Sequence, residues 1–302
     1  MRSESQSSKA SRIEESRMKI SKIAVIGAGT MGHGIAQVAA QAGFDVALED
    51  VSEDFVKRGI ARIEDNLKKG VERGKVTEAD MLSALSRIQI STDVEGAART
   101  ADLVIEAVVE KLDAKRELFS QLDRACKDDA ILATNTSSLS IAGIASATSR
   151  ADRVIGMHFF NPVHIMKLIE VVIASETSQE TLAAALDVAA RMGKEAITVK
   201  DAPGFATSRL GVALGLEAMR MLEQGVASAE DIDKAMSLGY NHPMGPLRLT
   251  DLVGLDIRLS IAEYLFEKLA SEVFRPPDIL RRKVAEGKLG KKTGEGFYRW
   301  ND

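Results

Sequence analysis

The stretch KIAVIGAGTMG, residues 22–32, decides the fold of this chain. A short apolar run leads into Gly27-Ala28-Gly29-Thr30-Met31-Gly32, and a helical pattern follows. Gly27 permits a tight turn, Gly29 lets backbone N–H groups approach a pyrophosphate, and Gly32 lets the helix pack closely on the strand. The N-terminus of that helix stabilises the anion. The stretch therefore predicts that residues 27–32 bind a dinucleotide.

Asp50 ends the next apolar run, residues 44–50. A carboxylate at this place accepts hydrogen bonds from the adenine ribose hydroxyls and repels a 2′-phosphate. It favours NAD over NADP as the cofactor. Lys57 and Arg58 follow closely, so the strictness of that preference stays open.

Short β-branched runs alternate with longer helical patterns on both sides of these motifs. The runs are continuously apolar, which is typical of strands buried on both faces of a parallel sheet. Strand followed by helix, repeated, predicts an α/β fold with a Rossmann-type, doubly wound, mostly parallel sheet. The predicted strands are 22–27, 44–50, 87–90, 102–108, 130–134, 153–159 and 167–172, and the predicted helices between them are 31–42, 53–73, 111–125 and 178–192.

The pattern changes near residues 201–204, Asp-Ala-Pro-Gly, where proline and glycine punctuate the chain. Beyond them the sequence is helical, without a strand of similar quality. We therefore predict an NAD-binding domain over 19–201, with a helical hairpin inserted at about 53–86, and an all-helical domain over 202–302. The predicted C-terminal helices are 205–224, 228–238, 254–270 and 276–286, with Leu210, Leu214, Met219 and Leu222 at helical spacing.

Composition excludes several classes of protein. The chain has 302 residues and a net charge of −4, which argues against nucleic-acid binding because that needs a basic face. No apolar run approaches the roughly 20 residues of a membrane span. Cys126 is the single cysteine, so disulfide frameworks and cysteine-rich zinc sites are excluded, no metal is expected, and a cytoplasmic location is favoured.

The first 18 residues are rich in serine and have no apolar core of a secretory signal. Their three arginines favour a mitochondrial transit peptide, whereas their three glutamates oppose one. We predict a disordered extension over residues 1–18.

The stretch HFFNPVHIMKLIE, residues 158–170, holds a candidate catalytic pair. His158 ends a predicted strand, where such sheets bind ligands, and it can take a proton from a hydroxyl as a hydride leaves for the nicotinamide. Glu170 is an acid in an apolar strand that needs a partner, and a tight connection through Asn161 could return it to His158. A carboxylate on the far ring nitrogen would orient the imidazole and stabilise the imidazolium. His164 has no such companion, and we interpret it as structural.

Together these segments resemble the L-3-hydroxyacyl-CoA dehydrogenases, including the 3-hydroxybutyryl-CoA dehydrogenases. The resemblance runs from about residue 19 to 300. The segments that carry it are IGAGTMGHGIAQVAAQAG, LVIEAVVEKLDAKRELF, NTSSLSI, HFFNPVHIMKLIEVV, KDAPGFATSRL, PMGPLRLTDLVGLD and GKKTGEGFY.

The resemblance implies a homodimer through the helical domain, NAD as cofactor and an acyl-CoA substrate. It implies that His158 is the general base and that Glu170 orients it. The implied cofactor contacts, besides residues 27–32 and Asp50, are Glu110, Lys115, Ser137, Asn161 and Lys292. The implied substrate contacts are Ser137, Ser208, Asn66 and Arg73, and the last two are not the residue types that the family carries on the hairpin.

Ser208 also departs from the family, which commonly has an asparagine before the arginine at this place. The acyl-chain preference is therefore open. The sequence favours reversible, NAD-dependent oxidation of (3S)-3-hydroxyacyl-CoA to 3-ketoacyl-CoA. Two alternatives remain: a dehydrogenase of a 3-hydroxy acid without coenzyme A, and a catalytically idle NAD-binding protein.

Overall fold

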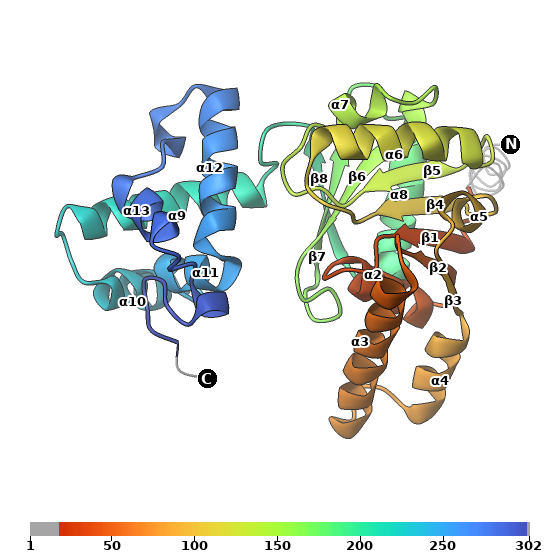
Figure 1. Ribbon diagram of the computed structural model, residues 1–302, viewed down its shortest axis with the longest axis horizontal. Coiled ribbons are helices and arrows are strands. Elements are labelled where there is room, and N and C mark those ends of the chain that lie inside the picture. The colour runs from red at the N-terminus through yellow and green to blue at the C-terminus, as the bar shows by residue number, and fades with distance from the viewer. Residues whose placement is uncertain (1–17, 301–302) are drawn as a thin grey trace, which may run out of the picture. The chain divides into compact units, whose positions relative to one another are not determined.

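The computed structural model describes residues 18–300, which form two compact units (Figure 1). The first unit ends at Asp201 and the second begins at Ala202. The predicted extension over residues 1–18 lies outside the described residues except for Met18, which packs against the core of the first unit. None of the helices within residues 18–300 is long and apolar enough to cross a membrane.

An eight-stranded sheet forms the centre of the first unit, in the order β3-β2-β1-β4-β5-β6-β7-β8. Neighbouring strands are parallel except β6 and β7, which are antiparallel. The prediction of a Rossmann-type, mostly parallel sheet is confirmed. The strands are β1 (Lys22–Ile26), β2 (Asp45–Glu49), β3 (Ile88–Ser91), β4 (Leu103–Glu106), β5 (Ile131–Thr134), β6 (Val154–Phe159), β7 (Leu168–Ile173) and β8 (Glu195–Lys200).

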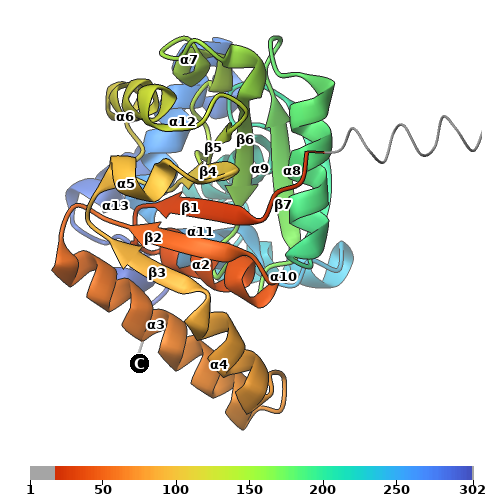
Figure 2. The same ribbon diagram turned by 90° about the vertical axis from the view of Figure 1, so that its right-hand side faces the viewer.

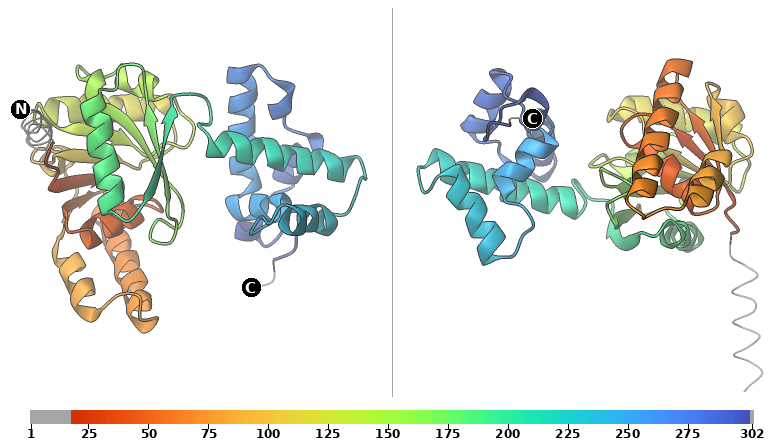
Figure 3. Two further views of the ribbon diagram at one scale, coloured as in Figure 1. Left: turned by 180° about the vertical axis from the view of Figure 1, so that it is seen from behind. Right: turned by 90° about the horizontal axis from the view of Figure 1, so that it is seen from below.

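Helices cover both faces of this sheet. On one face α2 and α8 lie over the strands, and on the other lie α5, α6 and α7 (Figures 2 and 3). The apolar core between α2, α8 and the sheet includes Ile35, Ile105 and Val188, which are fully buried. The helices of this unit are α2 (Gly32–Gln41), α3 (Glu53–Glu72), α4 (Glu78–Ser86), α5 (Val94–Ala98), α6 (Leu112–Ala125), α7 (Ile141–Ala145) and α8 (Gln179–Arg191).

Helices α3 and α4 form a hairpin that extends past the edge of the sheet at β3 (Figure 2). Side chains cap both helices, because Ser52 Oγ accepts from Phe55 N at 3.4 Å and Thr77 Oγ1 accepts from Asp80 N at 3.1 Å. The hairpin spans residues 53–86.

Strand β8 differs from the prediction, which ends the sheet at residue 172. It is an edge strand whose residues are mostly exposed to solvent, and Ile197 is 39% exposed. An edge strand needs no continuous apolar run, so the sequence carries no signal of the kind that marks β1 or β4.

Five helices build the second unit: α9 (Thr207–Glu223), α10 (Ala229–Gly239), α11 (Pro246–Val253), α12 (Leu255–Leu269) and α13 (Asp278–Ala285), with short 3-10 turns among residues 272–293. Its core contains Val212, Leu216 and Met219 of α9. Leu210, which lies at helical spacing with Met219 in the sequence, has a side chain that is 71% exposed. Helix α11 is also absent from the prediction.

Candidate active site

In the turn between β1 and α2, the backbone at Gly29 is open, whereas Gly27 and Gly32 are closely packed against other backbone atoms. A Cβ at Gly27, whose φ is +100°, would lie 2.8 Å from the carbonyl oxygen of Ala107, and a Cβ at Gly32 would lie 1.6 Å from that of Gly27. No atom lies within 4 Å of a Cβ position at Gly29. The turn is therefore tightly packed around an open approach to the Gly29 backbone, as a pyrophosphate requires. Ala28, Thr30 and Met31 complete this loop.

Asp50 braces the same turn. Its Oδ2 accepts from Ala28 N at 2.7 Å and its Oδ1 from Val51 N at 2.8 Å. The neighbouring Glu49 is 2% exposed, and its Oε1 has no hydrogen-bond partner within residues 18–300. Burial, and secondarily the charges of Asp50 and Asp93, raise the pKa of Glu49 to about 7.

The parallel strands bring several polar groups to one edge of the sheet. Register pairs Ile26 with Glu106, Glu106 with Thr134, and Thr134 with Gly156. Strands β1, β4 and β5 therefore end side by side, and β6 continues beyond them to Phe159. The strand order reverses between β1 and β4. This carboxyl edge, at a topological switch point, is where open α/β sheets bind ligands.

Glu106 and Lys115 form a buried ion pair at this edge. Lys115 Nζ lies 2.6 Å from Glu106 Oε1, and the two residues are 1% and 0% exposed. Thr134 Oγ1 donates to Glu106 Oε2 at 2.6 Å, and Val108 N donates to Oε1 at 2.7 Å. Sequence reasoning missed Glu106, although an acid that ends the apolar strand LVIE is itself a signal.

Glu110 joins this ion pair to the turn that follows β5. Its Oε2 lies 3.3 Å from Lys115 Nζ, and its Oε1 accepts from Thr136 Oγ1 at 2.5 Å. The same oxygen accepts from Ser137 N at 2.8 Å and Ser137 Oγ at 3.1 Å. Glu110, Lys115 and Ser137 are thus brought together. Lys115 lies buried beneath Glu110, so in this structure it positions Glu110 and presents no exposed ammonium.

His158 and Glu170 face each other across the antiparallel pair of β6 and β7. His158 Nδ1 lies 2.7 Å from Glu170 Oε2, and both side chains are buried. A carboxylate at Nδ1 holds the ring proton there and leaves Nε2 as the basic nitrogen. The ring of Phe160 lies against the imidazole, with centroids 4.5 Å apart. Asn135 Oδ1 accepts from Phe159 N at 2.8 Å and holds the end of β6.

The other predicted residues of the first unit lie in the connection after β6 and on α3. Asn161 is exposed in the connection between β6 and β7. On α3, Asn66 Nδ2 donates to Gln37 Oε1 at 3.2 Å, and Arg73 is exposed at the C-terminal end of the helix. His164, interpreted as structural, is exposed.

The second unit holds two predicted residues. Ser208 is half-buried on the first turn of α9. Lys292 Nζ pairs with Asp256 at 2.6 and 2.7 Å.

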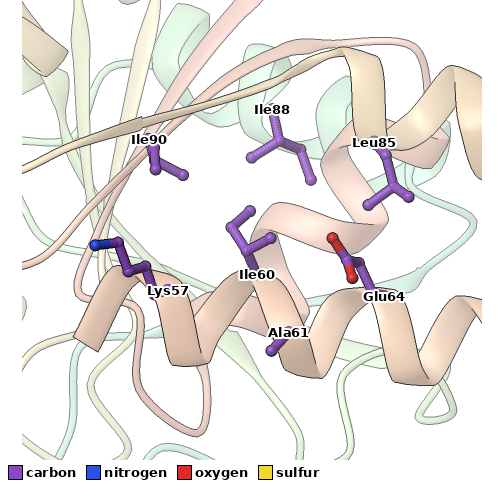
Figure 4. Close-up of a pocket in the computed structure, with 7 residues that line it drawn as sticks. All are labelled: Lys57, Ile60, Ala61, Glu64, Leu85, Ile88 and Ile90. Carbon is purple, nitrogen blue, oxygen red and sulfur yellow. The ribbon is translucent and has the colours of Figure 1, made fainter. Parts of the chain in front are cut away.

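A separate pocket of about 380 Å³ lies between α3, α4 and β3 (Figure 4). It contains none of the predicted site residues. Lys57, Ile60, Ala61, Glu64, Leu85, Ile88 and Ile90 line it. Within residues 18–300, no group of His, Cys, Asp and Glu side chains could hold a metal ion.

Known proteins share both units of the chain. The model of the 3-hydroxyacyl-CoA dehydrogenase NAD binding domain matches residues 22–202, and that of the 3-hydroxyacyl-CoA dehydrogenase C-terminal domain matches residues 204–300. A probable 3-hydroxybutyryl-CoA dehydrogenase of Bacillus subtilis is 48% identical, over 94% of this chain and 99% of its own. The human mitochondrial hydroxyacyl-coenzyme A dehydrogenase is 45% identical, over 99% of this chain and 97% of its own.

Solved structures of proteins with related sequences also have the same fold as this chain. The crystal structure of an (S)-3-hydroxybutyryl-CoA dehydrogenase from Ralstonia eutropha superposes with a TM-score of 0.91 at 44% identity, covering 94% of this chain and 100% of its own. Because the domain models match both units and the relatives align over nearly their whole length, the chain belongs to the 3-hydroxyacyl-CoA dehydrogenase family.

Proposed function

We propose that the protein oxidises (3S)-3-hydroxyacyl-CoA to 3-ketoacyl-CoA with NAD⁺, reversibly, with 3-hydroxybutyryl-CoA as one substrate. The observation that carries the proposal is the buried contact of 2.7 Å between His158 Nδ1 and Glu170 Oε2 at the carboxyl edge of the sheet. A hydroxyl is oxidised when its proton and the hydride of its carbon leave for different acceptors. NAD⁺, when bound, accepts the hydride, and His158 is the proton acceptor.

In this mechanism His158 Nε2 takes the hydroxyl proton while Nδ1 keeps its own, so the ring becomes an imidazolium. Glu170 stabilises that cation and holds the ring in one orientation. In the reverse direction the imidazolium returns the proton to the carbonyl oxygen. The burial of both side chains supports this role, because the attraction between a carboxylate and an imidazolium is stronger in a site that excludes water than in bulk water.

The loop of residues 27–32 and the N-terminus of α2 would hold the pyrophosphate of NAD, and the open approach at Gly29 supports this assignment. Asp50 would bind the adenine ribose. The nicotinamide side would be held by Glu110, Ser137 and Asn161, with Lys115 acting through Glu110 and Lys292 as a further contact.

The substrate would contact Ser137 and Ser208 near its reacting end. Coenzyme A would contact Asn66 and Arg73 of the α3–α4 hairpin. Both residues lie on α3 or at its end, and Arg73 is exposed there, which supports a role in binding the phosphates of coenzyme A.

The finer predictions of assembly and location belong to the same proposal. Exposed apolar side chains in the second unit support a homodimer through its helices. They include Leu249, Leu252 and Val253 of α11 and Ile257 of α12, each 37 to 46% exposed. A cytoplasmic location is part of the proposal as well.

The proposal is tested by following NADH oxidation with acetoacetyl-CoA in the wild-type protein and in His158→Gln. We expect the variant to bind NADH nearly as the wild type does and to lose turnover by roughly 10²–10⁴-fold, the contribution of a general base. His242→Gln, in the second unit, is the matched control. If His158→Gln retains its turnover, the base lies elsewhere, and if the wild type reduces only free 3-keto acids, the substrate carries no coenzyme A.

A further inference from the structure

Four basic side chains of the first unit gather near the start of α2. His33 lies in the first turn of α2, Arg62 on α3, His164 in the connection between β6 and β7, and Lys194 immediately before β8. None of the four belongs to the catalytic pair or to the assigned cofactor contacts. The charge of Arg62 acts on His33, and the charges of His33 and Lys194 act on His164. Positive groups that repel one another attract an anion to the place where they meet.

Helices α2 and α3 bring His33 and Arg62 to the same place. The two helices follow the parallel strands β1 and β2, so both begin at the carboxyl edge of the sheet, and they lie side by side (Figures 1 and 2). Asn66 Nδ2 of α3 donates to Gln37 Oε1 of α2 at 3.2 Å. His33 and Arg62 lie four residues before these partners on their own helices. They therefore occupy the same two helix faces, one turn nearer the carboxyl edge.

The connection between β6 and β7 is held against the start of α2. A Cβ at Gly34 would lie 2.8 Å from the Cβ of Val163, so the connection packs closely on this turn of the helix. Lys194 Nζ donates to the carbonyl oxygens of Val163 and Met166, the latter at 2.8 Å. The two carbonyl groups flank His164 in the chain. The lysine therefore fixes the backbone of His164 near α2.

His33 donates to an anion only as an imidazolium. Its Nδ1 lies 2.7 Å from the carbonyl oxygen of Gly29, which can only accept, so Nδ1 carries a proton and Nε2 of the neutral ring is an acceptor. Burial, and in smaller part the charge of Arg62, lower the pKa of His33. Burial, followed by the charges of His33 and Lys194, lowers the pKa of His164. A bound anion would favour the charged form of both rings.

The cluster is accessible, and its charges are not paired with acids. Arg62 and His164 are exposed, and His33 is half-buried. Within residues 18–300, no ion pair joins any of these three to a carboxylate. Asp65, which lies close to Arg62 on α3, pairs with Lys69 at 2.6 Å. An anion from solution can therefore approach all three side chains.

We propose that His33, Arg62 and His164 bind the diphosphate of coenzyme A. The inference rests on the proposed function, in which coenzyme A also contacts Asn66 and Arg73. Coenzyme A carries, in order from its thioester, a pantetheine arm, a diphosphate and a phosphorylated adenosine. On α3, Arg62 lies nearer the carboxyl edge, and so nearer the reacting end of the substrate, than Asn66 or Arg73 does. The diphosphate is therefore the phosphate group that reaches Arg62, whose planar fork matches phosphate oxygens.

The test compares acetoacetyl-CoA, acetoacetyl-dephospho-CoA, which lacks only the 3′-phosphate, and acetoacetyl-pantetheine, which lacks every phosphate. With the first two, Arg62→Gln should lower the kcat/KM of NADH oxidation by at least about 5-fold, less than a buried charge-assisted hydrogen bond gives because Arg62 is exposed. With acetoacetyl-pantetheine, its kcat/KM should stay within about 2-fold of the wild type. Arg124→Gln is the control, because it removes an exposed arginine from the last turn of α6, on the opposite face of the sheet.

Three outcomes overturn the proposal. A loss in Arg62→Gln that disappears with acetoacetyl-dephospho-CoA would assign Arg62 to the 3′-phosphate. A loss as large with acetoacetyl-pantetheine would show that the effect does not come from a phosphate. A similar loss of NADH affinity, measured by fluorescence titration, would assign the diphosphate of NAD to Arg62.

Proton uptake tests the two histidines. Calorimetric titration with dephospho-CoA near pH 7, in buffers of different ionisation enthalpy, should show that the wild type takes up protons on binding. Dephospho-CoA is the probe because it lacks the phosphate monoester, which itself titrates near pH 6. His33→Gln and His164→Gln should each take up fewer protons, while Arg62 and Lys194, the other charged groups that act on these rings, stay in place. Uptake that is absent in the wild type, or unchanged in both variants, overturns the proposal.

The titration also keeps this site distinct from the proposed function, because binding of dephospho-CoA needs no turnover. A wild-type protein that oxidises NADH with none of the thioesters overturns the proposed function. Weaker binding of dephospho-CoA by Arg62→Gln than by Arg124→Gln would still support the diphosphate site. Equal binding by the two variants, together with normal turnover of acetoacetyl-CoA, overturns the site and leaves the dehydrogenase intact.

Discussion

Lys115 lies 2.6 Å from Glu106 in an ion pair that is almost wholly inaccessible to solvent. Thr134 Oγ1 and Val108 N donate hydrogen bonds to the Glu106 carboxylate. Glu110 contacts Lys115 and accepts a hydrogen bond from Ser137 N. Through its contact with Glu110, the buried pair fixes the position of Glu110 on the candidate nicotinamide side of the site.

Glu106→Gln should destabilise the protein by about 3–5 kcal/mol, because it leaves the ammonium of Lys115 buried without its main counter-charge. The double variant Glu106→Gln with Lys115→Met should recover a large part of that loss. Urea unfolding monitored by circular dichroism measures both. A double variant as unstable as the single one would show that the cost comes from packing and not from the unpaired charge.

Glu170→Gln should lower kcat by roughly 10²–10⁴-fold with little change in NADH affinity, because an amide cannot stabilise the imidazolium of His158. Steady-state kinetics and fluorescence titration with NADH give the two quantities. Glu176→Gln, an exposed glutamate just beyond β7, is the control. The dyad has no catalytic role if Glu170→Gln and this control have the same kcat.

Glu49 should make the stability of the protein fall as the pH rises. Its pKa is about 7 in the folded protein and 4.5 as the reference value, so between these pH values the folded state holds a proton that the unfolded state has lost. The unfavourable contribution is absent below pH 4.5 and complete above pH 7, where it reaches about 3 kcal/mol at about 1.4 kcal/mol per pKa unit.

Glu49→Gln removes this dependence, because an amide stays neutral. We expect the variant to match the wild type near pH 4.5 and to exceed its free energy of unfolding increasingly up to pH 8. Urea unfolding across the pH series tests this, with Glu117→Gln measured alongside to subtract the loss of one surface carboxyl. A stability difference that does not change with pH would falsify the assignment.

Gly29→Ala should impair NAD binding without impairing folding, whereas Gly32→Ala should impair folding. A methyl group at Gly29 meets no atom within 4 Å, so Gly29→Ala should fold with a stability within about 0.5 kcal/mol of the wild type and lose NAD affinity by at least about 10-fold. At Gly32 the methyl group would lie 1.6 Å from a carbonyl oxygen, so that variant should be severely destabilised. Thermal unfolding with and without NAD distinguishes the two, and unchanged NAD affinity in Gly29→Ala would contradict the assigned pyrophosphate site.

Sequence alone determined the architecture of the sheet and the nature of its central motif. Buried parallel strands such as β1 and β4 need continuous apolar runs, and a tight strand-to-helix turn needs glycine, so both leave marks in local sequence. The pairing of His158 with Glu170 was also within reach, because an acid in an apolar strand demands a partner close by along the chain.

Tertiary structure decided what local patterns do not encode. Edge strand β8 lacks an apolar run, and Leu210 follows the helical period of α9 yet faces outward. The contacts of Thr134 with Glu106 and of Asn135 with Phe159, each between residues more than 20 positions apart, depend on which segments meet in the fold. Hydrophobic periodicity indicates which face of its own helix or strand a residue lies on. The residues that it contacts are determined by strand register and helix packing. The pKa and reactivity of a charged group depend on those contacts.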